Sequence, residues 1–384
     1  MKQGWEIKKL GEVFDLQMGK TPSRDNGDYW GGDNVWVAIS DLQDKYIGES
    51  KEHITDKALT ETKIKKVKAG TTIMSFKLSV GRAAITTQDL YTNEAIMAFN
   101  LNEGYDLIAD YIYYYLKGYK WQGANKAVMG LTLNKASISQ NHIAIPPREE
   151  QERIVEELDC LSGVIEKKRE QLRELDALAQ SIFYQMFGDP ITNEKGWEVK
   201  RLGEVCHKIG DGLHGTPKYD EDGGVAFING NNLIDGKIVI TDRTLFVNDI
   251  EAQKYRIDMD ANTILLSING TLGRTAIFRN ENVILGKSAC YCNINNTFLI
   301  TKFVEHLMNS LSFKGFLEDN SSKSTIKNVG LKAIRGYGII LPPLTLQQNF
   351  AEKIEAIENQ KELIKQSITQ TEELFNSRMD YYFN

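Results

Sequence analysis

Long apolar runs are missing from this sequence, which argues against a membrane protein. No stretch approaches the roughly 18 consecutive apolar residues that a membrane-spanning helix needs. The first residues, MKQGWE, carry no apolar signal-peptide core. We therefore expect a cytoplasmic protein with no membrane partner.

Cysteine and histidine are also scarce, at four and five of 384 residues. The cysteines have neither zinc-finger spacing nor a disulfide framework, so we interpret them as small buried apolar residues. The histidines form no HxxxH or HExxH pair, so no metal site is predicted. The cysteines are Cys160, Cys206, Cys290 and Cys292.

Motifs for catalysis and for cofactors are absent as well. The sequence contains no phosphate-binding loop, dinucleotide turn, nucleophile elbow or Asn/Asp-Pro-Pro-aromatic methyltransferase signature. Asp189 followed by Glu198 and Lys200 imitates a nuclease pattern. However, Glu198 belongs to a duplicated segment whose other copy, at Glu6, has no upstream aspartate. We predict neither catalytic residues nor a cofactor bound by this chain.

An internal repeat organises the chain. Residues 4–13, GWEIKKLGEV, recur at 196–205 as GWEVKRLGEV, with eight of ten residues identical. The offset of 192 residues still holds where residues 81–85 match 273–277, and it has become 196 at the two Pro-Pro pairs. The chain therefore reads as module, helix, module, helix.

A long amphipathic helix is predicted after each Pro-Pro pair. Its apolar residues recur at alternating three- and four-residue steps, which indicates a coiled-coil seam. Lys168 interrupts the first seam and Lys361 the second. The predicted seam residues are Ile154, Leu158, Leu161, Ile165, Leu172, Leu175 and Ile182 in the first helix, and Phe350, Ile354, Ile357, Ile364, Ile368 and Phe375 in the second.

The two seams can cover each other, because nothing else of comparable length is available to either. We expect an antiparallel pair within the chain; the alternative is two intermolecular zippers in a homodimer. About 36 residues at 1.5 Å each would give a spacer of about 54 Å. Thr345 with Gln348 fits a capping box for the second helix, with Glu149 as a weaker cap for the first.

The modules between the helices are predicted to be mostly β. Runs of β-branched and apolar residues end in turns that contain glycine, as hairpin strands do. One helix per module is expected, at residues 105–117 and 298–311. The expected strands are 71–76, 83–86 and 142–145 in the first module, and 263–268, 275–278 and 338–341 in the second.

Charge is distributed unevenly. Residues 149–187 hold 5 basic and 10 acidic residues, and residues 345–384 hold 4 basic and 7 acidic residues. The two helices together therefore have a net charge of −8, and the modules have a net charge of +2, which gives the total of −6. Near-neutral modules can still present a local basic face to nucleic acid. The modules also differ most from each other at residues 23–68 and 218–258, which suits two copies of one frame that recognise different targets.

Polar side chains gather on the predicted loops, where they suit nucleic acid. Hydroxyl and ammonium groups bind phosphates. In the major groove, bases are usually recognised by pairs of hydrogen bonds, from arginine to guanine and between asparagine and adenine. The alternative for each residue singly is a solvated surface position. The candidates are Lys20, Thr21, Lys77, Ser79, Arg82, Lys126 and Lys135 in the first module, and His214, Thr216, Lys218, Asn269, Thr271, Arg274, Lys323, Ser324 and Lys327 in the second.

Three motifs together resemble the specificity (S) subunit of type I restriction-modification enzymes. They are the duplicated W-E-[IV]-K-[KR]-L-G-E-V segment, the Pro-Pro-x-x-x-Gln start of each long helix, and QSIFYQMFGDP at residues 180–190. The resemblance covers essentially the whole chain. It implies an α+β fold with an internal pseudo-two-fold repeat, in which two tandem target-recognition domains, 1–148 and 188–344, are separated by antiparallel spacer helices, 149–187 and 345–384.

The resemblance also implies partners. Each domain would read half of a split double-stranded DNA sequence. Two modification (M) subunits would bring S-adenosylmethionine to methylate adenine N6, docking on residues 151–187 and 347–383. Restriction (R) subunits would add ATP- and Mg²⁺-dependent translocation and cleavage. One departure from the repeat is Arg378 in place of Ile182, so the last turn of the second helix is expected to pack differently.

Two other classes of function remain as alternatives. A scaffold protein could use its coiled coil to recruit partners without DNA. A self-sufficient restriction or modification enzyme is disfavoured by the missing cofactor motifs. The recognised bases do not follow from the sequence, because base contacts depend on side-chain geometry, water and DNA shape.

Overall fold

The computed structural model of the chain describes residues 4–122, 125–127 and 130–384, and the side chains of residues 123–131 are outside that description. The chain divides into two units. Unit 1 comprises Met1–Glu170 and Lys365–Asn384, and unit 2 comprises Gln171–Ile364. Each unit therefore contains one module and a part of both long helices.

Unit 1 is built on a five-stranded sheet in the order β2-β10-β6-β8-β4, with smaller sheets β5-β3-β9, β11-β12-β7 and β1-β13. Its strands are β1 (Glu6–Lys9), β2 (Phe14–Met18), β3 (Trp30–Val37), β4 (Tyr46–Ile47), β5 (Glu52–Ile54), β6 (Thr72–Ser75), β7 (Lys77–Leu78), β8 (Ala83–Thr86), β9 (Tyr91–Thr92), β10 (Ile96–Leu101), β11 (Asn125–Ala127), β12 (Gly130–Thr132) and β13 (His142–Ile145). Its helices are α1 (Leu10–Val13), α2 (Asp56–Thr62), α3 (Ala109–Gly118), α4 (Lys135–Gln140) and the first part of α5 (Arg148–Phe187).

Unit 2 repeats this plan on a four-stranded sheet in the order β15-β23-β20-β21, with smaller sheets β19-β16-β22, β17-β18 and β14-β24. Its strands are β14 (Glu198–Arg201), β15 (Cys206–Asp211), β16 (Val225–Ile228), β17 (Leu233–Ile234), β18 (Lys237–Ile238), β19 (Leu245–Val247), β20 (Thr263–Ser267), β21 (Thr275–Ile277), β22 (Val283–Leu285), β23 (Ala289–Ile294) and β24 (Gly338–Leu341). Its helices are α6 (Asp249–Gln253), α7 (Thr301–Asn309), α8 (Leu311–Asp319), α9 (Leu331–Gly336) and the first part of α10 (Leu344–Phe383).

The duplicated segment at the start of each module forms a strand that pairs with the last strand of the same module. β1 pairs with β13 in the register Glu6↔Ile145, and β14 pairs with β24 in the register Glu198↔Leu341. The predicted hairpins β6–β8 and β20–β21 are confirmed as antiparallel pairs. Every residue of β6 and β20 is buried, as expected for central strands rich in β-branched and apolar residues.

The predicted number of helices was wrong. The two expected helices exist as α3 and α7, although they begin three to four residues later than predicted. Unit 1 also contains α1, α2 and α4, and unit 2 contains α6, α8 and α9. Of these, all but α8 have seven residues or fewer, which is too short for a 3.6-residue apolar period to be recognised in the sequence.

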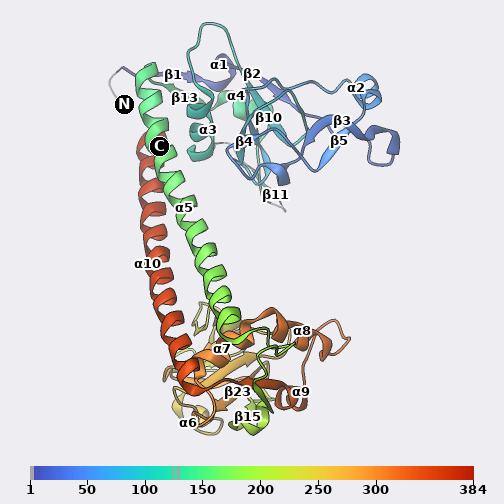
Figure 1. Cartoon of the computed structure of the whole chain (residues 1–384). Coiled ribbons are helices and arrows are strands. Elements are labelled where there is room, and N and C mark those ends of the chain that lie inside the picture. Colours follow the sequence, from blue (N-terminus) through green and yellow to red (C-terminus); the bar gives the residue numbers. More distant parts are fainter. Residues whose placement is uncertain (1–3, 123–124, 128–129) are drawn as a thin grey trace. The chain divides into compact units, whose positions relative to one another are not determined.

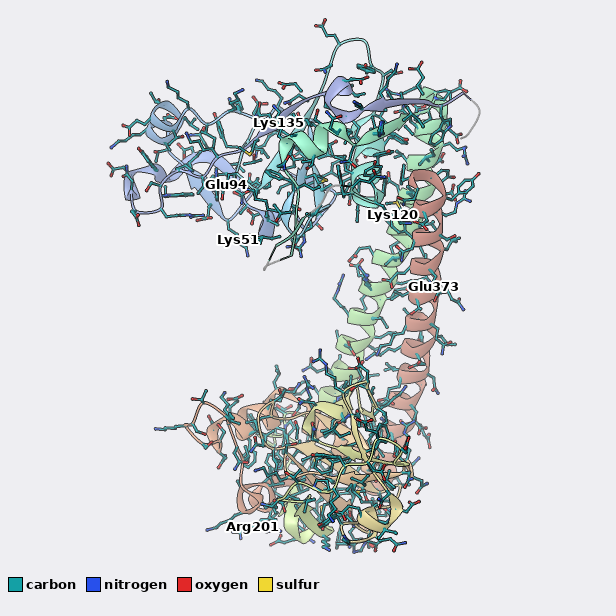
Figure 2. All side chains as sticks on the ribbon, turned by 180° about the vertical axis from the view of Figure 1, so that it is seen from behind. Lys51, Glu94, Lys120, Lys135, Arg201 and Glu373 are labelled. Atoms are coloured by element: carbon teal, nitrogen blue, oxygen red, sulfur yellow. The ribbon has the colours of Figure 1, made fainter. Side chains whose placement is uncertain are left out.

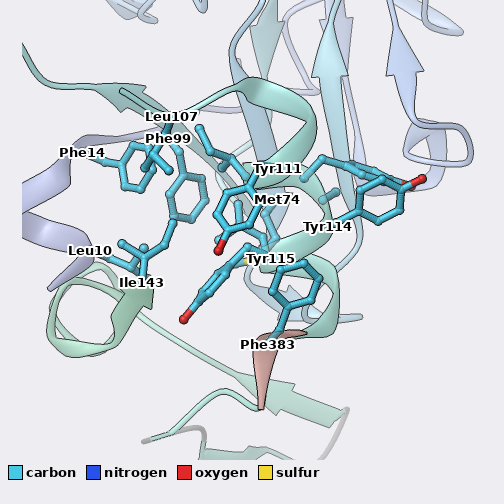
Figure 3. Packing of buried hydrophobic residues seen from close by; sticks show 14 of the residues in the cluster. Leu10, Phe14, Met74, Phe99, Leu107, Tyr111, Tyr114, Tyr115, Ile143 and Phe383 are labelled. Carbon is cyan, nitrogen blue, oxygen red and sulfur yellow. The ribbon is translucent and has the colours of Figure 1, made fainter. Parts of the chain in front are cut away.

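Aromatic side chains join each module to the long helices. In unit 1 the ring of Phe383, at the end of α10, lies 5.4 Å from that of Tyr115 and 5.7 Å from that of Tyr111, both on α3 (Figure 3). In unit 2 the ring of Phe183, near the end of α5, lies 5.6 Å from that of Phe350 on α10. Both ends of the helix pair are thus part of a module core.

The two long helices run antiparallel in each unit (Figure 1). In unit 1 Arg169 on α5 contacts Glu372 on α10 at 2.7 Å, and Glu157 contacts Arg378 at 2.9 Å. In unit 2 Asp176 on α5 pairs with Lys361 on α10. Pairing within the chain, rather than zippers between two chains, therefore accounts for the seams. All thirteen predicted seam residues are buried or half-buried.

Arg378 does pack differently from its counterpart in the repeat. Its guanidinium pairs with Glu157, and the hydroxyl of Tyr382 donates to the same carboxylate at 2.5 Å. The hydrogen bond from Arg378 and the burial that opposes it leave the pKa of Glu157 below its usual value. Ile182, at the equivalent place in unit 2, packs against apolar core residues instead.

The predicted capping boxes are wrong, because α5 and α10 begin immediately after the second proline of each pair. Thr345 and Glu149 therefore lie inside the first turn. A fully buried glutamine organises each helix start instead. Gln151 donates to the carbonyls of Pro146 and Asp106 at 2.9 and 2.8 Å and accepts from the amide of Ile108 at 3.0 Å.

Gln347 makes the same three hydrogen bonds in unit 2. It donates to the carbonyls of Pro342 and Phe298 at 2.8 and 3.1 Å and accepts from the amide of Ile300 at 2.9 Å. Each glutamine thus ties the Pro-Pro start of a long helix to the segment that leads into α3 or α7. Buried amide and carbonyl groups need such partners, which explains the glutamine of the Pro-Pro-x-x-x-Gln motif.

Candidate nucleic-acid interface

The predicted loops of each unit converge at one edge of its main sheet. β2 and β6 end at this edge in unit 1, while β10 and β8 begin there, because neighbouring strands are antiparallel. In unit 2, β15 and β20 end where β23 and β21 begin. We call these places the loop edges. They comprise residues 19–22, 76–82 and 93–95 of unit 1, and residues 212–218, 268–274 and 286–288 of unit 2.

A buried serine shapes the hairpin turn at each loop edge. The hydroxyl oxygen of Ser75 accepts from the amide of Arg82 at 3.2 Å, and that of Ser267 accepts from the amide of Arg274 at 2.8 Å. Both serines are fully buried, whereas both arginine side chains are exposed. The two units therefore share a turn that directs an arginine outward.

A further loop joins each hairpin turn. In unit 1, β7 within the turn pairs with β12, in the register Leu78↔Leu131. In unit 2 the amide of Gly270 donates to the carbonyl of Lys327 at 2.9 Å, and Asn269 lies opposite Asn328. We therefore add the predicted polar loop at residues 323–328 to the loop edge of unit 2.

Two of the unit 1 candidates are held by the protein itself. The ammonium group of Lys20 donates to the carbonyl of Thr62 at 2.7 Å, and the hydroxyl of Thr21 donates to Glu94. Figure 2 labels Glu94 in this module. These contacts occupy the groups that were predicted to meet phosphates, so Lys20 and Thr21 are weaker candidates than the hairpin residues.

The other unit 1 candidates divide by exposure. Lys77 and Ser79 are half-buried, and the Lys77 ammonium lies 5.4 Å from the ring centre of Phe76. Lys135 is exposed in the first turn of α4 (Figure 2). The side chain of Lys126 lies outside the described part of the structure.

In unit 2, four candidates have side-chain partners within the protein. The imidazole of His214 lies 2.7 Å from Asp211, and Lys327 pairs with Glu318. The side-chain amide of Asn269 donates to Asn328 at 3.4 Å, and the hydroxyl of Ser324 donates to the carbonyl of Ile326 at 2.6 Å. All unit 2 candidates have exposed side chains apart from Asn269, which is half-buried. The remaining ones are Thr216, Lys218, Thr271, Arg274 and Lys323.

Sequence reasoning missed Lys287. This exposed residue lies on the turn between β22 and β23, and its amide donates to the carbonyl of Leu213 at 3.0 Å. The strand pairings Ile96↔Ser75 and Ala289↔Ser267 place it where unit 1 has Glu94. The Gly-Lys-Ser turn between two apolar runs was the available signal.

Exposed cations gather at the loop edges without neutralising partners. Among the described residues, Arg82, Arg274, Lys287 and Lys323 form no ion pair. Unpaired exposed cations attract phosphates and are the electrostatic footprint of nucleic-acid binding. The described part of the chain contains no cluster of metal-ligating side chains and no helix suited to crossing a membrane.

At the start of α7 in unit 2, a largely buried lysine fixes the module to α10. The Lys302 ammonium lies 2.7 Å from Glu305 and 2.8 Å from Glu358. Burial raises the pKa of Glu305 although Lys302 opposes it. Burial, aided by the positive charge of Lys302, lowers the pKa of the neighbouring His306 to about 4. His306 is therefore a neutral ring stacked on Phe183, with ring centres 5.2 Å apart.

Comparisons with known proteins agree with this duplicated architecture. The chain is 25% identical over 396 residues to the type I restriction enzyme MjaIX specificity subunit of Methanocaldococcus jannaschii, which covers 94% of this chain and 89% of that protein. The crystal structure of a type I restriction-modification S subunit from M. genitalium shares the fold, with a TM-score of 0.56, 13% identity, and coverage of 98% of this chain and 95% of that one.

A further solved chain, from work on complex assembly and conformational transition of the type I R-M system, gives a TM-score of 0.64 at 19% identity. It covers all of this chain and 98% of that one. Two stretches of the present sequence, residues 2–176 and 194–373, match the type I restriction modification DNA specificity domain. The chain therefore belongs to this family and contains two copies of its domain.

Proposed function

We propose that this chain is the DNA-recognition subunit of a type I restriction-modification enzyme, and that each loop edge reads one half of a bipartite DNA target. The observation that carries the proposal is the duplicated hairpin turn, which presents Arg82 in one unit and Arg274 in the other from the same buried-serine frame. The frame is shared while the surrounding side chains differ, which suits two different half-sites.

Catalysis belongs to partners in this proposal. Two modification subunits supply S-adenosylmethionine and methylate adenine N6, and restriction subunits supply the ATP- and Mg²⁺-dependent steps. Adenine inside a duplex must be flipped out at a cost of about a few kcal/mol. DNA binding by both units offsets that cost by anchoring the duplex on either side of the target bases. The protein acts in the cytoplasm, where the DNA is.

The long helices are proposed to dock the modification subunits along residues 151–187 and 347–383. Leu178 on α5 and Leu374 on α10, 196 residues apart, are equivalent positions of the repeat and are 47% and 50% exposed. Exposed apolar residues at the same position of both repeats support two copies of one partner. Glu373, next to Leu374 and labelled in Figure 2, is exposed beside it.

The proposal is tested by a genome-wide map of N6-methyladenine in cells with and without the gene. We expect one bipartite motif, methylated on both strands, to disappear when the gene is deleted. If no motif changes although the modification subunit is expressed, and the reconstituted complex shows no salt-sensitive DNA retention, the chain is a scaffold and the proposal is wrong.

The same map tests the helices as the element that sets the half-site spacing. Inserting one helical turn, about four residues, into both α5 and α10 is expected to lengthen the unspecified gap and leave both half-sites unaltered. An unchanged gap in the methylated motif would reject this role of the helices. Insertion into α5 alone is the control, because it breaks the register of the helix pair and should abolish methylation of the motif.

A further inference from the structure

Leu78 has an unfavourable conformation for its residue type. It lies in the hairpin turn of unit 1 with φ of 65°, in the left-handed region, and its side chain is 56% exposed. The equivalent position in unit 2 is Gly270, with φ of 76°. The equivalence is set by the shared turn, in which the loop after it meets Leu78 through Leu131 and Gly270 through Lys327.

This position favours glycine on physical grounds. A side chain with a Cβ is strained in the left-handed region, whereas glycine adopts it at no steric cost. An exposed leucine also gains little from burial, since most of its surface stays in water. Leu78 is thus unfavourable for the fold in two respects, and strained residues of this kind cluster where a protein meets a ligand.

The surroundings of Leu78 indicate which ligand. The turn also carries Lys77, Ser79 and Arg82, while its other apolar residue, Val80, packs against the core, so Leu78 is the exposed apolar side chain of the turn and stands among polar and cationic groups. Among the described residues of this turn, Leu78 has no exposed apolar neighbour, so they offer a protein partner no continuous apolar patch. Duplex DNA offers anionic phosphates to the cations and, in its major groove, one apolar group on a base edge, the C5-methyl of thymine.

Resting on the proposed function, we propose that Leu78 reads a thymine methyl group in the half-site bound by unit 1. Gly270 has no side chain, so unit 2 reads no base through this position. The two hairpin turns therefore impose different base requirements on a common backbone.

The test uses the full chain assembled with its modification subunits and a labelled duplex that carries the methylated motif. Each thymine of the first half-site is replaced in turn by deoxyuridine, which removes only the methyl group, and binding is measured by fluorescence anisotropy. For the unaltered chain we expect one replacement to weaken binding about fourfold, the contribution of one buried methyl group. For Leu78→Gly we expect that replacement to have no effect.

Lys63→Gly is the matched control. Lys63 is the exposed C-terminal cap of α2, with φ of 53°, so it has the same backbone conformation in the same unit. Both glycine variants relieve left-handed strain and should unfold at no lower denaturant concentration than the unaltered chain. Only Leu78→Gly should lose the discrimination between thymine and deoxyuridine.

Two results overturn the inference and leave the proposed function standing. One is a Leu78→Gly complex that discriminates as the unaltered complex does. The other is a Leu78→Gly complex that binds every duplex more weakly by the same factor, which indicates a wedge between base pairs. If the unaltered complex binds the motif no better than scrambled DNA, the proposed function itself fails.

Discussion

Removing the buried amide of Gln347 should destabilise unit 2 alone. We consider Gln347→Leu, which keeps the approximate volume of the side chain and deletes its three hydrogen bonds, to Pro342, Phe298 and Ile300. The side chain is fully buried, so water cannot replace the lost partners. The amide of Ile300 and two carbonyls are left unsatisfied.

Each unsatisfied buried group costs about 1–3 kcal/mol. Because three groups share one side chain and can relax together, we expect a loss of about 3–5 kcal/mol rather than the full sum. A domain is stable by about 5–15 kcal/mol, so unit 2 should remain folded in water. With a denaturant dependence of about 2–3 kcal/mol per molar urea, its midpoint should fall by about 1–2.5 M.

Hydrogen exchange at increasing urea concentration resolves the two units. Amides of α7 should lose protection at lower urea concentration in Gln347→Leu, while amides of α3 in unit 1 keep theirs. Gln348→Leu is the control, because Gln348 is an exposed neighbour that only donates to Glu352 at 3.1 Å. Equal shifts for Gln347→Leu and Gln348→Leu would refute the reasoning from buried hydrogen bonds. A shift of similar size in α3 would refute its restriction to unit 2.

The remaining predictions concern acid stability and DNA affinity. The pKa of His306 is lowered to about 4 in the folded chain and is about 6.5 in an unfolded one, so protons favour unfolding. The free energy of unfolding of unit 2, measured by urea titration, should therefore decline as the pH falls from 6.5 to 4. His306→Phe should make this decline shallower, and an equally steep decline in the variant would exclude His306 as its source. Arg274→Ala should weaken binding to the second half-site by about 1–3 kcal/mol and relax its sequence preference. Arg201→Ala, which removes an exposed arginine of β14 outside the loop edge, should not, and equal losses would exclude base reading by Arg274. Lys287→Ala should lower the slope of log affinity against log salt by about 1 without altering sequence preference, and an unchanged slope would contradict a phosphate contact.

Much of the fold could be predicted because it is encoded locally and twice. The β-branched runs, the glycine turns and the seams are short-range patterns, and their recurrence at a fixed offset identified them as structural units. The pairing of β1 with β13 did not follow from the sequence. It joins segments from opposite ends of a module, and pairing between such distant strands leaves no local pattern.

The candidate site was predictable only in part, for a related reason. Arg82 and Arg274 lie in the duplicated turn, so their common exposure could be expected from the turn itself. Lys20 and Thr21 are also residue types that bind phosphates, but their side chains already donate to the carbonyl of Thr62 and to Glu94, respectively. Thr62 belongs to the segment that differs most between the modules, so comparing the two copies could not reveal this contact.

Buried polar groups such as Ser75 and Ser267 are identical in the two units, and so are the exposed arginines Arg82 and Arg274, whereas other residues of the turns differ. Ser75 and Ser267 shape the turns through their hydrogen bonds. Both hydroxyls are buried, so leaving either without a partner would lower the stability of its unit by about 1–3 kcal/mol. Lys77 and Asn269 share one half-buried position of these turns, where folding imposes no comparable constraint because the two residues differ. Buried polar groups therefore fix the backbone of the reader, and positions such as this one stay free to change the bases it reads without loss of stability. Leu78 marks the limit of that freedom, because there the side chain of the reader destabilises its own turn.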